Sequence, residues 1–597
     1  MSGGMDQQFG DLDPVTFEVL RNTFEYVCRR MTVILQKSSF SPILSENLDF
    51  SNAIYDPELR LIGQTANCPV HLAAMHFSVQ AVDRKFGIET LKPGDVVVLN
   101  DPYEGGTHLN DVTLTMPVFY DEELIGFAVS RGHWMDLGGG GPGGQGFGTH
   151  VAGEGLRLPP MKLYENYEVN ADLLEILLRN TRTPHYIKGD LQAHMGALLA
   201  AEEELQTTAG KYGKDVLLNG MSQMIGYTER IVRAAIEAIP DGTYEGADYA
   251  DSDGISDGKI WVRLKLTVNG DAIHVDFDGS DPQCAGAINS PYANTAAAIY
   301  TALQFFLAPD APPNAGMFAP ISFSLPEDCW LNAKWPAPVV GCTTITSGKV
   351  QSAIWQAVAK ALPDLAIAPT CADANWFVAA VRGKDGRIDV FSDIPAGGWG
   401  GTPYNDGLNV TLDPLGNCTN MPAEAAELLY PIEVEAFDLR SDSGGPGENR
   451  GGLGARFRFR FIEGGELSIE TSRTLEGSPG VNGGGFSPVQ VLIKERPDGV
   501  RKVIGGTSED GSWTSPLLSS HKFGPGESFE FLSTGGGGWG TVRSRDPERV
   551  LDDVLDEYIT MEAAERDYLV AIDRDTMTVD EAATKRLRSR DIRGRQR

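Results

Sequence analysis

The chain has 597 residues, of which 41% are hydrophobic and 22% charged, as in an ordinary globular protein. Its 50 basic and 82 acidic residues give a formal net charge of −32, which repels nucleic-acid phosphates and anionic lipid heads. Length and charge therefore exclude a single small domain and disfavour partners made of nucleic acid or membrane.

The seven cysteines are scattered singly and form no CxxC pair. An odd number of isolated thiols in a long chain is typical of a reducing compartment rather than of a disulfide framework. The first residues are acidic and lack the apolar run of a signal peptide, and no stretch of about 18 apolar residues occurs. We therefore expect a cytoplasmic protein that does not cross a membrane.

The N-terminal part combines helical and strand patterns. Asp13-Pro14 is typical of a helix start, and apolar residues recur at helical spacing from Leu20 to Ile34. Residues 39–65 predict two short strands around an Asp-Pro turn, and residues 69–86 predict another helix.

Residues 94–136 are the most informative segment. GDVVVLNDPYEGG predicts a strand that runs into a glycine turn, and VTLTMPVFYDEELIGFAVSRGHW predicts a β-hairpin. His108 and Asp111 then lie at a strand start and His133 at the end of the hairpin. Antiparallel strands can bring such ends together across a sheet.

His108, Asp111 and His133 form the main candidate site. Two imidazoles and a carboxylate suit Zn, Mn or Fe(II), and three protein ligands leave positions open for water or substrate, as in catalytic metal sites. Spacing alone also allows simple hydrogen-bonded histidines, because His-x-x-Asp is common by chance. The glycines around both halves would let a ligand approach closely.

Further candidates lie near this segment. The glycine run 138–144 is either a phosphate cradle or a flexible lid, and it lacks the Lys-Ser/Thr of a P-loop. Arg157 can clamp a carboxylate or phosphate, or pair with a neighbouring acid. His71 starts a helix and either approaches the site or packs. Neither a nucleotide-binding motif nor a GxSxG nucleophile motif is present, so no residue is assigned to cofactor binding.

The predicted secondary structure changes several times along the rest of the chain. Residues 171–239 are helix-rich, residues from 241 predict strands, and glycine-punctuated strands dominate from about 384 to 545. The pattern predicts an α+β fold with several domains, mixed or antiparallel sheets and glycine-rich loops. The predicted division is an α+β metal-site domain (1–240), an α+β middle domain (241–383), a glycine-rich β domain (384–545) and a C-terminal helical tail (546–597).

Ordered phrases across nearly the whole chain resemble the hydantoinase B/oxoprolinase family. They run from Pro14 to about Tyr568 and include LDFSNAIYD, LNDPYEGGTHLNDVTLTMPVF, GHWMDLGG, EGLRLPPMKLY and GGPGENRGGLG. The resemblance implies a partner subunit of hydantoinase A type that binds ATP with Mg and phosphorylates a carbonyl oxygen of the substrate. A partner with that role fits the missing nucleotide motif in this chain.

The resemblance also implies roles for single residues. A divalent metal would be held by His108, Asp111 and His133, as in the related carboxylases. Asp136 would orient an imidazole or act as a general base, and Arg157 and His71 are the other candidate catalytic residues. Trp134 stands where many members have a histidine, which indicates either a drier pocket, an aromatic substrate or simple packing.

Three functions follow as expectations. The first is a subunit of an ATP-dependent hetero-oligomeric hydrolase, in which water attacks the activated carbon of a hydantoin, an oxoproline or another lactam. The second is a subunit of a biotin-independent ketone carboxylase acting on acetone or acetophenone, for which a small accessory subunit is expected. The third is a non-catalytic scaffold for the ATP-binding subunit. We expect the hydrolase, because hydrolases make up the larger share of the family.

Overall fold

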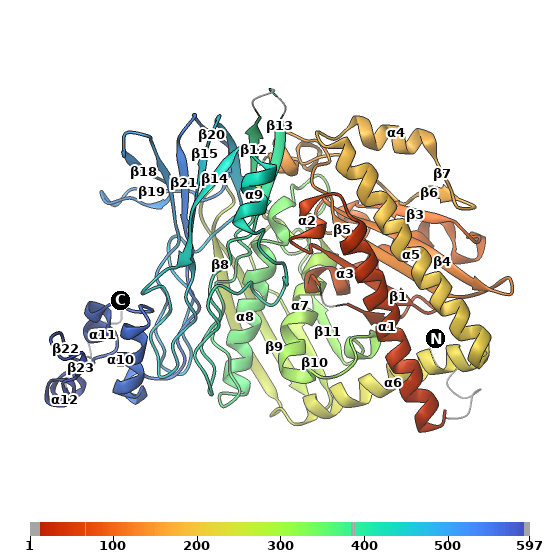
Figure 1. Cartoon of the computed structure of the whole chain (residues 1–597). Coiled ribbons are helices and arrows are strands. Elements are labelled where there is room, and N and C mark those ends of the chain that lie inside the picture. Colours follow the sequence, from red (N-terminus) through yellow and green to blue (C-terminus); the bar gives the residue numbers. More distant parts are fainter. Residues whose placement is uncertain (1–11, 66, 147, 384–385, 387, 590–597) are drawn as a thin grey trace.

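The computed structural model describes residues 12–65, 67–146, 148–383, 386 and 388–589. Helices and several largely antiparallel sheets alternate along this part of the chain (Figure 1), which confirms the predicted α+β class. None of the helices in the described part is long and apolar enough to span a bilayer.

A seven-stranded sheet forms the centre of the N-terminal part, with the order β2-β1-β5-β4-β3-β6-β7. Its strands are β1 (Phe50–Tyr55), β2 (Leu61–Gln64), β3 (Val96–Leu99), β4 (Asp111–Tyr120), β5 (Glu123–His133), β6 (Met161–Glu165) and β7 (Glu168–Val169). The predicted hairpin is β4–β5, and the two strands predicted within 39–65 are β1 and β2, preceded by the short helix α2 (Pro42–Ser45).

Helices cover both faces of this sheet. Helices α1 (Pro14–Ser38) and α5 (Pro184–Tyr212) pack against the face that carries Val96 and Val98. Helix α3 (Pro69–Phe86) packs against the other face, which carries Val97 and Leu99. Because successive side chains of a strand point to opposite faces, Asp111 and His133 lie on the α3 side.

The middle of the chain packs against the far side of α3. A four-stranded sheet with the order β11-β10-β9-β8 shares an apolar core with α3 and with two further helices. These elements are β8 (Gly242–Ser252), β9 (Asp257–Asn269), β10 (Ala272–Asp276), β11 (Ile321–Ser324), α7 (Tyr292–Leu307) and α8 (Thr346–Ala361). Helices α4 (Ala171–Arg179) and α6 (Lys214–Glu237) lie in the helix-rich segment that precedes this sheet.

Two sheets with a phenylalanine-rich core form the C-terminal β region. Their orders are β13-β12-β16-β20 and β14-β15-β21-β17-β18-β19. The RFRFRF motif lies in β15 and alternates as a strand should, with the phenylalanines buried and the arginines paired with glutamates. The elements are β12 (Phe377–Arg382), β13 (Ile388–Asp393), α9 (Ala423–Leu429), β14 (Ile432–Leu439), β15 (Ala455–Phe461), β16 (Gly465–Ile469), β17 (Val491–Glu495), β18 (Arg501–Thr507), β19 (Trp513–Thr514), β20 (Leu518–Phe523) and β21 (Ser528–Leu532).

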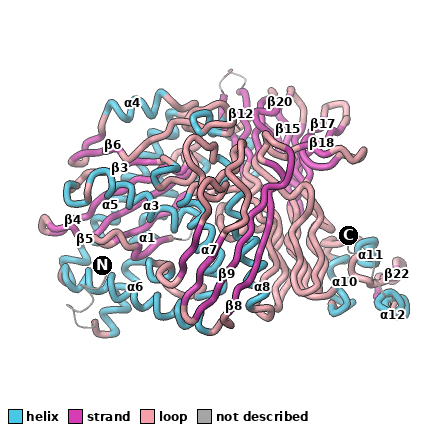
Figure 2. Tube along the Cα trace, turned by 180° about the vertical axis from the view of Figure 1, so that it is seen from behind, coloured by secondary structure: helices cyan, strands magenta, loops and turns pink. Residues whose placement is uncertain are grey.

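The glycine clusters of this region belong to long loops that run side by side between α8 and the C-terminal helices (Figure 2). Their backbones touch directly: a Cβ atom on Gly536 would lie 2.0 Å from the carbonyl oxygen of Trp399, and one on Gly451 would lie 1.9 Å from that of Gly536. Glycine is therefore required here for close packing of backbone on backbone.

A small helical region closes the described chain, as predicted. It contains α10 (Pro547–Leu555), α11 (Met561–Arg566), α12 (Glu581–Ser589) and a hairpin of β22 (Ile572–Asp573) and β23 (Thr578–Val579). The division into four domains remains a proposal. The largest apolar cluster joins the N-terminal sheet to Trp376, Val378 and Leu412, so the core continues across two of the proposed boundaries.

Candidate metal centre

The β4–β5 hairpin and the loop before it bring His108, Asp111 and His133 together. Asp111 is the first residue of β4 and pairs in register with His133, the last residue of β5. His108 lies three residues earlier, and its Nε2 atom is 3.3 Å from Asp111 Oδ1. His133 Nδ1 is 3.9 Å from the same oxygen. One donor atom from each residue lies within 4.8 Å of the others, which fits a shared cation.

His71 and Asp49 extend this donor set. His71, at the start of α3, places Nε2 3.1 Å from Asp111 Oδ1. Asp49 lies just before β1, and its Oδ2 atom is 3.5 Å from His133 Nδ1. The sequence suggested His71 but not Asp49. The available signal was the phrase LDFSNAIYD, whose strand β1 pairs with β5 and so carries Asp49 to His133.

The three predicted ligands are at most 3% exposed, so their charges interact strongly. Burial raises the pKa of Asp111, but the imidazoles of His108 and His71 outweigh burial and hold that pKa well below its usual value. Burial and the neighbouring His108 hold the pKa of His133 well below its usual value. An ionised aspartate and a neutral histidine are the forms in which these residues bind metals.

Asp111 Oδ1 gives a direct test of whether a cation fits. No donor meets this buried oxygen in hydrogen-bonding geometry, although Oδ2 of the same carboxylate accepts a hydrogen bond from Thr107. Leaving a buried charged oxygen unpaired costs roughly 1–3 kcal/mol or more. The oxygen faces the Nε2 atoms of His71 and His108, so a divalent ion among these donors would satisfy it.

Four of the donors, Asp49, His71, His108 and His133, line a small cavity whose other walls come from distant segments. These walls are formed by Thr343, Thr344, Ala374, Trp376, Ile394, Leu412, Asp413, Leu415, Gly416 and Cys418. The cavity volume is about 50 Å³, enough for water but far below the roughly 300–1,000 Å³ of a typical ligand site. A cyclic substrate therefore requires an opening movement of these walls.

The apolar cover of the site is Trp376 and not Trp134. The Trp376 ring lies 4.6 Å from the His133 ring and 6.2 Å from the His108 ring, measured between centroids. Trp134 is fully buried in the large core and does not line the cavity. Among the three interpretations of Trp134, the structure therefore favours packing.

Asp136 and Arg157 are not brought to the cavity. Asp136 accepts hydrogen bonds from the amides of Gly138, Gly143 and Arg182 and pairs with the Arg182 guanidinium at 2.7 Å. The anion held by the glycine loop is thus Asp136 itself, which favours a structural role over the predicted catalytic one. Arg157 pairs with Asp101 at 3.4 Å, the ion-pair alternative from the sequence.

The cysteines and one further acidic residue complete the description of the cavity. All seven cysteines are free, as expected from their spacing. Two of them, Cys68 and Cys418, line the cavity, which sequence reasoning did not predict. Asp413 also lines it, and burial raises the pKa of its carboxyl to about 7. Cys418 and Asp413 lie about 300 residues from the hairpin, and no local pattern links them to it.

Comparison with known proteins gives a consistent result. The family model described as Hydantoinase B/oxoprolinase matches residues 13–542. The chain is 30% identical to the beta subunit of caprolactamase from Pseudomonas jessenii, over 96% of this chain and 98% of that one. It is also 30% identical to the B subunit of a putative D-/L-hydantoinase from Pseudomonas sp. strain NS671, over 97% of this chain and 98% of that one.

Two solved structures have the same fold. The crystal structure of ATP-dependent caprolactamase from Pseudomonas jessenii matches with a TM-score of 0.89 and 29% identity, over 97% of this chain and 100% of that one. An acetone carboxylase structure matches with a TM-score of 0.87 over 96% of this chain and 82% of that one, but at 18% identity, so this likeness shows the fold alone.

Proposed function

The chain belongs to the hydantoinase B/oxoprolinase family, and we propose that it is the metal-containing subunit of an ATP-dependent enzyme that hydrolyses a cyclic amide. The members named above are enzymes, and the two near-full-length relatives at 30% identity are named for lactam and hydantoin substrates. The observation that carries the proposal is that His108 and His133 both face one buried carboxylate oxygen of Asp111.

His108, Asp111 and His133 would hold a divalent ion, with Asp49 as a further oxygen donor. Such an ion lowers the pKa of bound water toward about 7 and polarises a carbonyl oxygen. Zn, Mn and Fe(II) all suit this mixed set of donors. His71 places Nε2 3.1 Å from Asp111 Oδ1 and is a candidate proton carrier beside the ion.

The cavity walls supply two more functions. Trp376, Leu412 and Leu415 are apolar and keep bulk water away from the activated carbon. Burial raises the pKa of Asp413 to about 7, so its carboxyl can carry a proton near neutral pH. We assign Asp413 as the donor of the proton that the ring nitrogen needs when the carbon–nitrogen bond breaks.

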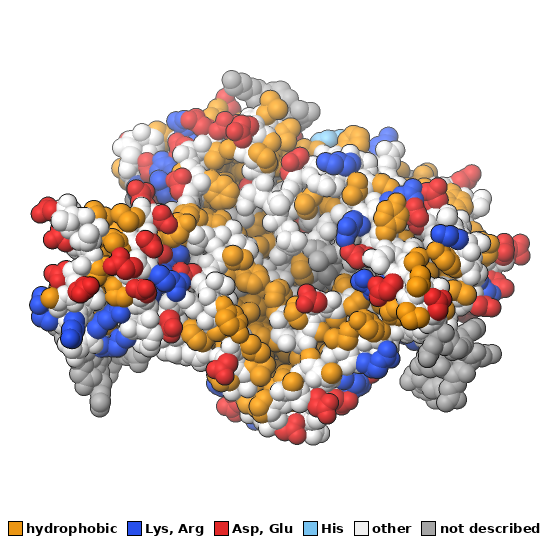
Figure 3. All heavy atoms as spheres, turned by 60° about the horizontal axis from the view of Figure 1, so that its bottom comes forward, with side chains coloured by type: hydrophobic (Ala, Val, Ile, Leu, Met, Phe, Trp, Pro, Cys, Tyr) orange, Lys and Arg blue, Asp and Glu red, His pale blue; other side chains and the backbone are white. Residues whose placement is uncertain are grey.

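We also propose that a second subunit of hydantoinase A type binds ATP with Mg and activates the carbonyl oxygen. Both relatives at 30% identity are named as one subunit of a larger enzyme, so they assemble with another chain. Figure 3 shows hydrophobic side chains gathered near the centre of one face, with charged side chains mostly toward its flanks. A contiguous apolar surface of this kind is typical of a protein that binds a partner.

The metal assignment is tested by elemental analysis of wild type and His108→Ala, each purified with the ATP-binding partner. We expect metal content to fall in the variant and turnover to fall at least about 100-fold, because loss of a supporting contact alone already costs 10–100-fold. His274→Ala, in β10 of the middle sheet, is the matched control and should change neither value. Unchanged metal content in His108→Ala would remove the ligand assignment.

A further inference from the structure

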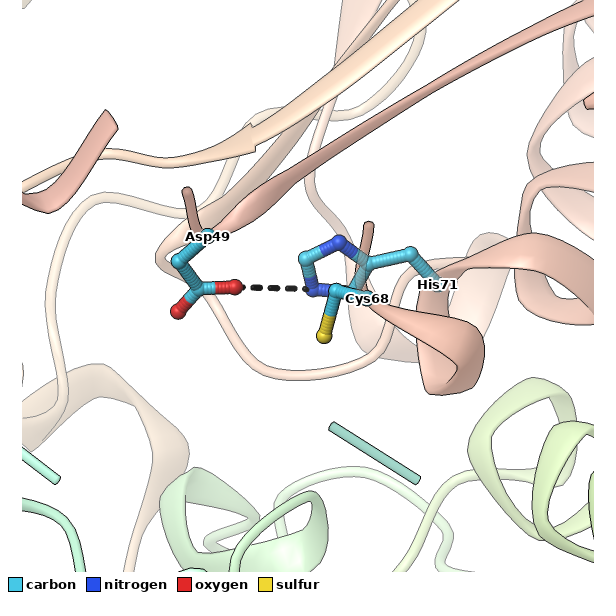
Figure 4. Close-up of side chains that lie close together, drawn as sticks. All are labelled: Asp49, Cys68 and His71. Carbon is cyan, nitrogen blue, oxygen red and sulfur yellow. Dashed lines mark ion pairs between the residues drawn. The ribbon is translucent and has the colours of Figure 1, made fainter. Parts of the chain in front are cut away.

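A second set of donors lies beside His108, Asp111 and His133. Asp49, Cys68 and His71 each offer one ligand atom within 4.8 Å of the others. Figure 4 shows the Asp49 carboxylate directed at the His71 ring, with the Cys68 thiol beside both. The function proposed above uses only Asp49 and His71 of this set, and it leaves the sulfur without a role.

The Asp49 carboxylate faces both sets, one oxygen to each. Its Oδ1 atom is 3.7 Å from His71 Nε2 in the second set, and its Oδ2 atom is 3.5 Å from His133 Nδ1 in the first. A carboxylate placed in this way can bridge two cations. Two-ion sites that activate water for hydrolysis use such shared ligands.

The thiol of Cys418 provides a fourth donor. The side chains of Cys68 and Cys418 interact with each other, although they are 350 residues apart. Both are free thiols and both line the same cavity as His71 and Asp49. Two sulfurs, one imidazole nitrogen and one carboxylate oxygen form the kind of soft, four-donor set that zinc prefers.

We propose that the chain binds a second, thiophilic divalent cation of the zinc class between Cys68, Cys418, His71 and Asp49. Binding breaks the two S–H bonds and releases both protons to solvent, and the two thiolates then neutralise the charge of the ion. No electron is transferred. The inference rests on the proposed function only where Asp49 bridges to the first ion, and it makes His71 a ligand of the second ion instead of a proton carrier.

The test is a cobalt titration of the reduced, metal-free full-length chain. We expect two equivalents to bind and a thiolate-to-cobalt charge-transfer band to appear in the near ultraviolet. The double variant Cys68→Ser/Cys418→Ser should bind one equivalent and lose the band. Cys28→Ser, which changes a buried thiol of α1, should keep both equivalents and the band.

His108→Ala separates this inference from the function proposed above. This variant should lose one equivalent and keep the band, because its lost ligand belongs to the first set. The wild-type titration tests the number of bound ions and the thiolate ligands even if a variant does not fold. One equivalent without the band overturns the second ion, and two equivalents without the band overturn the thiolate ligands. One equivalent with the band instead overturns the first ion, and with it the function proposed above.

Discussion

The two oxygens of Asp111 show how the site is organised at the scale of single residues. Oδ2 accepts a hydrogen bond from Thr107, which fixes the carboxylate, and Oδ1 faces the imidazoles of His71 and His108. Thr107 is fully buried and directly precedes His108 in the chain. A fixed carboxylate with one unpaired oxygen is suited to bind a cation without rearranging.

Asp413 is expected to control the alkaline side of the pH profile. Burial raises the pKa of its carboxyl from 3.8 to about 7, so the protonated form is present below pH 7 and is lost as the pH rises through that value. If Asp413 donates the proton to the leaving nitrogen, kcat should decline above about pH 7. Asp413→Asn should lower kcat about 100-fold or more and remove this decline, with metal content unchanged.

Asp393→Asn is the matched control for Asp413→Asn. Asp393 is also a buried aspartate whose pKa burial raises, to about 6, but it hydrogen-bonds to Asn47 and Asn420 and does not line the cavity. Its variant should keep the alkaline decline of kcat. A decline that survives in Asp413→Asn would assign the proton to another group.

Asp136 is expected to matter for stability rather than for chemistry. Asp136→Ala leaves the amides of Gly138, Gly143 and Arg182 without their acceptor and removes the carboxylate partner of the Arg182 guanidinium, so we expect a loss of about 3 kcal/mol in unfolding free energy. Arg157→Ala breaks a partly exposed pair and should cost less than about 1 kcal/mol. Chemical denaturation measures both. Normal stability with lost turnover in Asp136→Ala would instead support the catalytic role.

At the scale of elements, the β4–β5 hairpin was predictable because its pattern is local. Alternating apolar residues, a polar bend and the strand ends fixed the positions of His108, Asp111 and His133. Asp49 directly precedes β1, and His71 lies in α3. Asp413 and Cys418 lie in a loop that packs against the N-terminal sheet. No periodicity in the sequence specifies such tertiary contacts. The sequence could therefore predict the candidate ligands on the hairpin but not the residues that line the rest of the cavity.

The glycine-rich loops could be located in the sequence, but their role could not be predicted. Tight turns near a site were one interpretation, and in the structure many of these glycines allow extended backbones to touch. Gly536→Ala would push a Cβ to 2.0 Å from Trp399 O, and we expect a loss of about 3 kcal/mol or more.

Gly226→Ala is the contrasting change. This glycine lies inside α6, where a Cβ would meet only the end of the Arg230 side chain at 3.5 Å. We expect a gain of about 0.5–1 kcal/mol, because alanine restricts the unfolded chain and favours the helix. Equal effects of the two substitutions in urea denaturation would contradict the packing role of Gly536.

At the scale of the whole molecule, the site lies where three regions meet. The N-terminal sheet supplies the donors, α3 lies between that sheet and the middle core, and the segment 374–418 closes the cavity. The cavity of about 50 Å³ cannot hold a lactam, so these regions must separate for substrate to enter. Docking of the ATP-binding partner is the event that we expect to open it.

The most direct test of the central claim is an assay of the complex of this chain with the proposed hydantoinase A-type partner. Ring opening of caprolactam, hydantoin and 5-oxoproline is followed with and without ATP, in parallel with incorporation of labelled bicarbonate into acetone and acetophenone. We predict ATP-dependent ring opening of at least one cyclic amide, which is lost in His108→Ala. Bicarbonate incorporation without ring opening, or no ATP-dependent product from any of these compounds, would contradict the account.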